Sequence, residues 1–169
     1  MNWRTLVDLA GFQLVWWINA FGARYETSKL GILVAAAFIA FQIVIRWRST
    51  SLYRTILAAG LIGFAAENLL VATGLVQYAA PWPSQYLAPA WIVGLWLAFG
   101  TTVETMHRLL GSRPFPKAGR IGAIVGPLTY LAGASVGALA LPTPSGPSLL
   151  AVAAIWGLAL PYLLAVHAR

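Results

Sequence analysis

Residues 55–73 read TILAAGLIGFAAENLLVAT, and this stretch decides the fold class of the chain. A helix of about 20 largely apolar residues crosses the roughly 30 Å hydrocarbon core of a bilayer. Glu67 is the one charged side chain in the run. The whole chain has the same character, since 60% of its residues are hydrophobic and 9% are charged, against about 45–50% and about 25% in soluble domains. The composition therefore excludes a water-soluble fold.

Five other apolar runs resemble this one, with short polar or breaker segments between them. They cover residues 6–22, 30–45, 88–106, 121–141 and 148–166. A chain of 169 residues can hold six such spans when every loop is short, which leaves no room for a second domain. We therefore predict an all-α membrane protein with one domain over residues 1–169. It is expected to be a compact bundle of six transmembrane helices with short loops.

Basic residues predict the orientation of this bundle. Nine of them lie on one predicted side: Arg4, Arg46, Arg48, Arg54, Arg108, Arg113, Lys117, Arg120 and Arg169. The other side has only Arg24 and Lys29, and cytoplasmic loops retain positive charge. We expect a multi-pass protein with both termini in the cytoplasm. Because the basic residues are scattered through short loops, the formal charge of +7 does not indicate a nucleic-acid partner.

The sequence favours no cofactor and no metal. Cysteine is absent, which excludes disulfides, thiolate nucleophiles and cysteine metal ligands. The two histidines, His107 and His167, lie far apart in the chain. No phosphate loop, nucleophile elbow or dinucleotide fingerprint is present. We therefore expect no cofactor and no dedicated metal site.

Two glutamates, Glu67 and Glu104, are interpreted as intramembrane residues, where ionised groups are costly and mark functional sites. At about 1.5 Å per helical residue from the cytoplasmic ends, Glu67 lies about 18 Å deep and Glu104 about 5 Å deep. His107 and Arg108 follow Glu104 at neighbouring helical positions, so we favour an interfacial ion pair between Glu104 and Arg108. Glu104 and His107 remain a secondary candidate site on the cytoplasmic side.

Glu67 has no Lys, Arg or His within its own span, and burial disfavours its charged form. The same measure of depth places residues of the first and fifth spans in one layer with it. The candidate acid/base is Glu67, with Asn68 and Asn19 as its hydrogen-bond partners and with Trp16, Trp96, Thr129 and Tyr130 as the substrate-binding wall. Such a carboxyl group can donate or accept a proton on an apolar substrate. A hydrogen-bonded core that locks the helices and an ion path stay open as alternatives.

Small residues predict how the helices pack. The fifth run has four glycines near one face, and the third run has a looser stripe of glycines on the side of Glu67. They are Gly122, Gly126, Gly133 and Gly137 in the fifth run, and Gly60, Gly63 and Gly74 in or just after the third. Faces of this kind let helix backbones approach closely. We therefore expect the third and fifth helices to face each other.

Short motifs are spread along nearly the whole chain. They are Gly11-Phe12-Gln13 with Trp16, Glu67-Asn68-Leu69-Leu70 with Gly74, Pro89-x-Trp91 with Leu95-Trp96, and Gly126-Pro127-Leu128-x-Tyr130. In this combination the chain resembles domain-of-unknown-function family 2878, a family of small bacterial six-helix inner-membrane proteins. The resemblance implies the inner membrane of a Gram-negative bacterium and an association with genes that modify membrane fatty acids. The family often has an aspartate close to the glutamate, and Asn68 in that place weakens a two-carboxylate mechanism.

The preferred functional hypothesis is a protein that binds or modifies an apolar lipid or isoprenoid-like substrate in an intramembrane cavity. Its expected partners are membrane lipids and either a lipid-modifying enzyme or further copies of itself. A small carrier or a structural accessory subunit is the first alternative, although a carrier should show a polar path between both faces. The second alternative is similarity to membrane-embedded terpenoid cyclases, which use intramembrane carboxyl groups to protonate an alkene.

Overall fold

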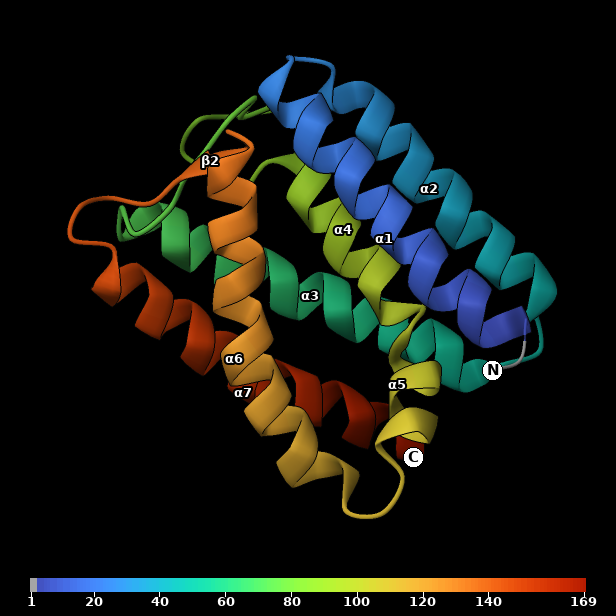
Figure 1. Ribbon diagram of the computed structural model, residues 1–169. Helices are drawn as coiled ribbons and strands as arrows, with labels where there is room; N and C mark the ends of the chain where they lie inside the picture. The colour runs from blue at the N-terminus through green and yellow to red at the C-terminus, as the bar shows by residue number, and fades with distance from the viewer. Residues whose placement is uncertain (1–2) are drawn as a thin grey trace.

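The computed structural model describes residues 3–169 and confirms the all-α prediction over that range (Figure 1). The elements are α1 (Trp3–Arg24), α2 (Ser28–Ile45), α3 (Thr50–Ala72), β1 (Gln77–Tyr78), α4 (Ala90–Gly100), α5 (Val103–Leu110), α6 (Pro114–Ser135), β2 (Leu139–Ala140) and α7 (Gly146–Ala168). Each strand has only two residues. The start of α1 and the end of α7 lie toward the same end of the bundle, and the two strands lie at the other end.

Four helices within residues 3–169 are long and apolar enough to cross a membrane, namely α1, α2, α3 and α7. They correspond to four of the six predicted spans. The predicted span 88–106 differs, because it is broken into α4 and α5. Thr101 and Thr102 lie at the break, and their hydroxyl groups donate to the carbonyls of Ala98 and Phe99 at 2.7 and 2.8 Å. Hydroxyl groups that bond to nearby backbone in this way compete with a regular helix.

The predicted span 121–141 differs at both ends. Helix α6 begins at Pro114, whose fixed φ suits the first turn of a helix, and it ends at Ser135. Gly137 follows with a φ of +81°, a left-handed conformation that a residue without Cβ adopts readily. The chain then forms β2, which pairs antiparallel with β1 in the register Gln77↔Ala140 and Tyr78↔Leu139. This pairing joins the α3–α4 connection to the α6–α7 connection.

The prediction that the third and fifth helices pack on each other through their glycines is wrong. Helix α6 packs on α7, while α3 packs on α4 and α7, and α1 packs on α2 and α4. The glycines are used at these other contacts. A Cβ on Gly122 would overlap the backbone carbonyl of Trp156 in α7, and a Cβ on Gly63 would overlap the Trp96 side chain in α4. Small residues therefore do permit close approach, but between different pairs of helices.

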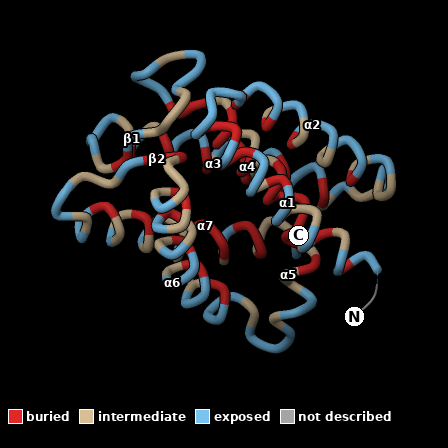
Figure 2. Tube along the Cα trace, turned by 45° about the horizontal axis from the view of Figure 1, so that its top comes forward, coloured by how far each residue is buried: buried red, intermediate tan, exposed pale blue. Residues whose placement is uncertain are grey.

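Polarity is distributed as expected for a protein surrounded by lipid. Buried residues face the centre of the bundle and exposed residues cover its outside (Figure 2). The outside is apolar, with Leu61 71% and Leu158 75% exposed, whereas Asp8, Gln42 and Glu67 are buried. In water this arrangement would leave large apolar side chains unprotected. A bilayer removes that cost, and the apolar helices are compatible with a membrane protein.

Candidate functional site

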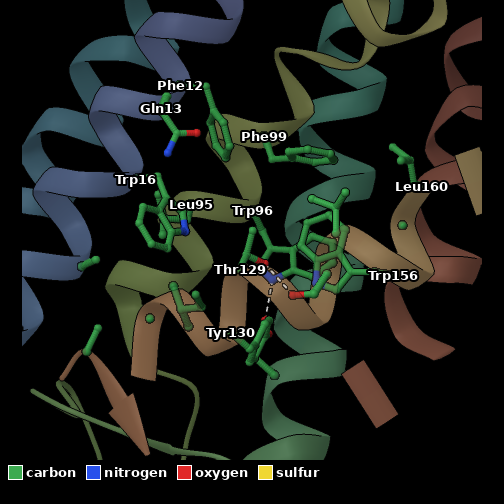
Figure 3. Close-up of a pocket in the computed structure, with 18 of the residues that line it drawn as sticks. Phe12, Gln13, Trp16, Leu95, Trp96, Phe99, Thr129, Tyr130, Trp156 and Leu160 are labelled. Carbon is green, nitrogen blue, oxygen red and sulfur yellow. Dashed lines mark hydrogen bonds between the residues drawn. The ribbon is translucent and has the colours of Figure 1, made fainter. Parts of the chain in front are cut away.

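The carboxyl group of Glu67 is the centre of the site. Glu67 lies in the last third of α3 and is 0% exposed. Its Oε1 accepts hydrogen bonds from Trp96 Nε1 at 2.7 Å and from Tyr130 Oη at 2.5 Å (Figure 3). Its Oε2 accepts a hydrogen bond from the hydroxyl group of Tyr78. Three donors from three elements outside α3 therefore converge on one buried carboxyl group.

Each donor is positioned by a different local feature. Trp96 comes from α4 and sits directly against Gly63, so that the indole reaches α3. Tyr130 comes from the last third of α6 and is 5% exposed. Tyr78 comes from β1, where pairing with Leu139 fixes the position of its backbone, and its ring packs edge-on against Trp91.

The arrangement can hold a proton in more than one place. An ionised carboxylate is an acceptor only, so it can accept all three hydrogen bonds at once. A protonated Glu67 would instead donate through one oxygen, and the Tyr78 hydroxyl can accept it, because Tyr78 Oη can itself donate to Tyr130 Oη at 3.5 Å. Burial and the nearby Glu67 raise the pKa of Tyr78 well above its ordinary value of 10. The phenol therefore keeps its own proton, and the exchangeable proton belongs to Glu67.

Glu67 borders an apolar cavity of about 290 Å³. The walls come from α1, α4, α6 and α7, and Trp156 of α7 stacks on Trp96 with ring centroids 4.3 Å apart. Phe99 packs edge-on against Trp156 at 5.0 Å. Among the described residues that line the cavity, only Glu67 and Tyr130 have ionisable side chains. The site is thus one polar cluster on the wall of a hydrophobic chamber.

The structure brings several of the predicted residues together. Trp96 and Tyr130 bond directly to Glu67, and Trp16 and Thr129 line the same cavity. The Thr129 hydroxyl donates to the carbonyl of Gly126 at 2.6 Å, so it contributes no free donor to the cavity.

The two predicted amide partners of Glu67 lie elsewhere, and this part of the prediction is wrong. Asn19 Nδ2 donates to the carbonyls of Val15 and Gly31 at 2.9 and 3.1 Å, which ties α1 to α2. Asn68 Nδ2 donates to the carbonyl of Phe64 at 2.7 Å, and its Oδ1 accepts from the backbone N–H of Ala88 at 3.0 Å. Both residues share the depth of Glu67 but point to other sides of their helices.

Sequence reasoning missed Tyr78. Its segment has aromatic and proline residues of the kind found at lipid headgroups, so nothing local indicated that the hydroxyl turns inward. The β1–β2 pairing, between segments about 60 residues apart, is what places it.

A second buried polar cluster, centred on Asp8, was also missed. Asp8 accepts hydrogen bonds from Gln42 Nε2 at 2.8 Å and from Thr105 Oγ1 at 2.6 Å. Arg46 lies 3.9 Å from Asp8 and donates to Gln42 Oε1 at 3.0 Å. The signal was present, because Asp8 falls inside the predicted span 6–22 and is an acidic residue in an apolar run. This cluster joins α1, α2 and α5 at the end of the bundle where α1 begins.

The secondary candidates belong to the edge of that cluster. Glu104 pairs with Arg46 at 3.3 Å, whereas the predicted partner Arg108 donates to Thr105 Oγ1 at 2.7 Å. The predicted ion pair within one helix is therefore replaced by a pair between α5 and the end of α2. His107 lies beside His167, with ring centroids 5.5 Å apart. No group of three metal-ligating side chains occurs among residues 3–169.

Residues 5–162 match a protein family described as "Protein of unknown function (DUF2878)". The chain belongs to this family. The match covers every helix that contributes to the Glu67 site, and it confirms the resemblance found in the short motifs. Neither a curated protein nor a solved structure matches this DUF2878 member.

Proposed function

We propose that this DUF2878 member binds an apolar lipid in its intramembrane cavity and that Glu67 transfers a proton to or from the bound molecule. The observation that carries the proposal is a buried carboxyl group, held by Tyr78, Trp96 and Tyr130, on the wall of an otherwise apolar chamber. A group that must work as an acid or base needs a fixed position and an environment that tunes its proton affinity. Both conditions are met at Glu67.

The size of the cavity limits the ligand. Ligand pockets have volumes of roughly 300–1,000 Å³, and this cavity of about 290 Å³ stands at the lower end of that range. It suits one hydrocarbon chain or an isoprenoid-like molecule, and it is too small for a phospholipid with two chains. Apolar walls provide most of the affinity for such a ligand through burial of its surface.

A cyclase-like mechanism receives less support. Glu67 is the only carboxyl group among the described residues that line the cavity, and Asp8 is committed to Gln42 and Thr105. A single acid can start a reaction by giving up its proton, but a second group is then needed to take one back. The nearest hydroxyl groups, those of Tyr130 and Tyr78, both donate hydrogen bonds to Glu67, so neither supplies that second group.

A structural role is the alternative with an observation in its favour. The three hydrogen bonds tie α3 to α4, α6 and β1, so Glu67 can also serve as a strut of an accessory membrane subunit. In that role Glu67 contributes only to stability. The protein is then a small carrier or an accessory partner of a lipid-modifying enzyme.

The proposed setting is the cytoplasmic membrane of a bacterium, crossed six times, with both termini inside. Helices α4 and α5 together would form the fourth crossing and α6 the fifth. The distribution of basic residues supports this orientation. In this setting membrane lipids are the immediate source of ligand.

The test compares Glu67→Gln with Glu67→Leu in a deletion strain whose lipid extract is profiled by mass spectrometry. Glutamine has nearly the same volume and can still accept hydrogen bonds, so we expect Glu67→Gln to keep the melting temperature. We expect it to abolish the lipid change, which is the difference in lipid profile between the deletion strain and the same strain carrying the wild-type protein. Leucine leaves three buried donors unsatisfied and should destabilise the protein by about 1–3 kcal/mol or more. Glu104→Gln is the matched control, because Glu104 lies outside the cavity. An unchanged lipid profile in the deletion strain and in Glu67→Gln would leave only the structural role.

A further inference from the structure

The cavity has an exposed side between α1 and α6. Val125 and Ile121 of α6 line the cavity and are 46% and 42% exposed, and Gln13 of α1 also lines it and is exposed. Helix α1 packs on α2 and α4, while α6 packs on α7, so the two helices that flank this side belong to different halves of the bundle. Figure 3 shows Gln13 and Trp16 facing the chamber from α1.

A hydrogen bond spans this side at one end. Arg24 Nη1, at the end of α1, donates to the carbonyl of Val136 just after α6 at 3.3 Å. The strip of α1 that lines the cavity runs from Leu9 to Ala20, about 16 Å at 1.5 Å per residue, and Gln13 within it is exposed whereas Ala20 is buried. In a bilayer this strip would face the hydrocarbon core.

Two donors that line the cavity have no hydrogen-bond partner among the described residues. Trp156 Nε1 is shielded from solvent and forms no hydrogen bond with a described residue, although Tyr130 lies beside it. Gln13 forms no hydrogen bond with a described residue, although it is an amide in the middle of an apolar helix. Buried or lipid-facing polar groups without partners are costly, and a bound molecule is one way to satisfy them.

We propose that the opening between α1 and α6 is a lateral portal through which a single-chain lipid enters from the bilayer and places an uncharged, oxygen-bearing head beside Trp156 Nε1 and Glu67. This inference rests on the proposed function and specifies its ligand class and entry route. The chain of the lipid then lies along the apolar wall formed by Leu9, Phe12 and Met106.

The charge of the head follows from the lining. No Lys, Arg or His is present among the described residues of the cavity wall, so a carboxylate or phosphate head would be buried beside Glu67 without a cation. An alcohol, an aldehyde or an ester carries an oxygen acceptor for Trp156 Nε1 and no charge. The lipid head would also enter from the hydrocarbon core beside Gln13, where a charged head is costly, so entry favours an uncharged head as well.

The portal can be tested with purified protein reconstituted in phosphatidylcholine vesicles. The probe is hexadecanol with a photoreactive diazirine on its chain, and cross-linked peptides are located by mass spectrometry. We expect labelling of the peptides that contain Phe12 and Met106, competed by hexadecanol and not by hexadecane. Labelling confined to lipid-facing positions such as Leu158, or equal competition by hexadecane, would overturn the ligand class.

Two variants test the route and the head contact. Val125→Trp places a large side chain in the portal from an exposed position and should reduce cavity labelling at least fivefold at an unchanged melting temperature, whereas Leu158→Trp on the lipid face of α7 should not. Trp156→Phe keeps an aromatic ring and removes the N–H, so hexadecanol should bind about threefold to tenfold more weakly. Undiminished labelling in Val125→Trp would exclude the portal, and unchanged hexadecanol affinity in Trp156→Phe would exclude the head contact.

The two proposals fail in different ways. If Val125→Trp binds the probe normally while Glu67→Gln still abolishes the lipid change in cells, the portal is wrong and the proton-transfer role stands. If the probe enters the cavity and the deletion strain has an unchanged lipid profile, binding stands without chemistry.

Discussion

Thr105 Oγ1 of α5 lies 2.6 Å from Asp8 Oδ2 of α1, a hydrogen bond between residues 97 positions apart. Gln42 of α2 donates to the other oxygen of the same carboxyl group at 2.8 Å. Asp8 therefore holds three helices together at the end of the bundle opposite to the β1–β2 pair. Its surroundings differ from those of Glu67, because Asp8 has Arg46 nearby and does not line the apolar cavity.

Replacing Asp8 should affect stability more than any other change of an acidic residue outside the Glu67 site. Asp8→Leu leaves the donors of Gln42 and Thr105 unsatisfied and should lower the free energy of unfolding by about 1–3 kcal/mol, measured by denaturation in mixed detergent micelles. Glu26→Gln is the control, since Glu26 is exposed, and should change it by no more than about 0.5 kcal/mol. Equal stability of the two variants would mean that the Asp8 cluster does not hold the helices.

The close glycine contacts between helices can be tested by adding a single methyl group, through a change of glycine to alanine. Gly122→Ala would push a Cβ into the Trp156 carbonyl, a backbone atom that cannot rotate away, and should destabilise the protein by about 1–3 kcal/mol. Gly94→Ala is the matched change in α4, where the nearest atom to the new Cβ is Ala35 Cβ at 3.6 Å. It should be neutral or slightly stabilising, because alanine favours helix more than glycine does. If both variants unfold alike, α6 and α7 are not in close contact.

Tyr78 offers a way to weaken the carboxyl site without touching Glu67. Tyr78→Phe removes the hydroxyl donor to Oε2 and keeps the ring against Trp91, so the melting temperature should fall only slightly, by the equivalent of about 0.5–1.5 kcal/mol. We expect a larger effect on the lipid profile, because Tyr78 supports the proton position on Glu67. Tyr86→Phe is the control at a position that is 77% exposed. If Tyr78→Phe gives the same lipid profile as the wild-type protein, the phenol has no part in proton transfer.

Depth along a helix could be predicted from the sequence, but direction around it could not. The estimate of depth correctly grouped Glu67 with Tyr130, whose hydroxyl group donates to it in the structure. It also grouped Asn19 and Asn68 with them, and both point elsewhere, because depth says nothing about which neighbour a side chain faces.

Long-range pairing and local competition explain the remaining differences. Tyr78 reaches Glu67 through a strand pair whose two strands, with two residues each, are too short to be recognised in the sequence. The break between α4 and α5 depends on Thr101 and Thr102 bonding to backbone one turn earlier, after a stretch from residue 88 to residue 100 that is continuously apolar. In contrast, Asp8 could have been identified, since its charge inside a predicted span was visible.

The clearest spans are α1, α2, α3 and α7, so the number of crossings depends on whether α4, α5 and α6 also cross the membrane. If only those four cross, the α5–α6 connection lies on the same side as the β1–β2 pair. If six segments cross, it lies on the opposite side, with the ends of the chain. Arg108, Arg113, Lys117 and Arg120 lie in or near this connection, and moving so many cations to the outer side is disfavoured. We therefore expect the six-crossing arrangement.

Cysteine labelling can separate the two arrangements, because the chain has no cysteine of its own. Ser112→Cys marks the α5–α6 connection and Gln85→Cys marks the α3–α4 connection, and both positions are exposed. In intact cells a membrane-impermeant maleimide should label Gln85→Cys at once and Ser112→Cys only after the membrane is permeabilised. Reporter fusions at Pro83 and Pro144 should report the outside, and those at Pro114 and Arg169 the inside. Labelling of Ser112→Cys in intact cells would reduce the crossings to four, and would place α6, one flank of the proposed portal, outside the hydrocarbon core.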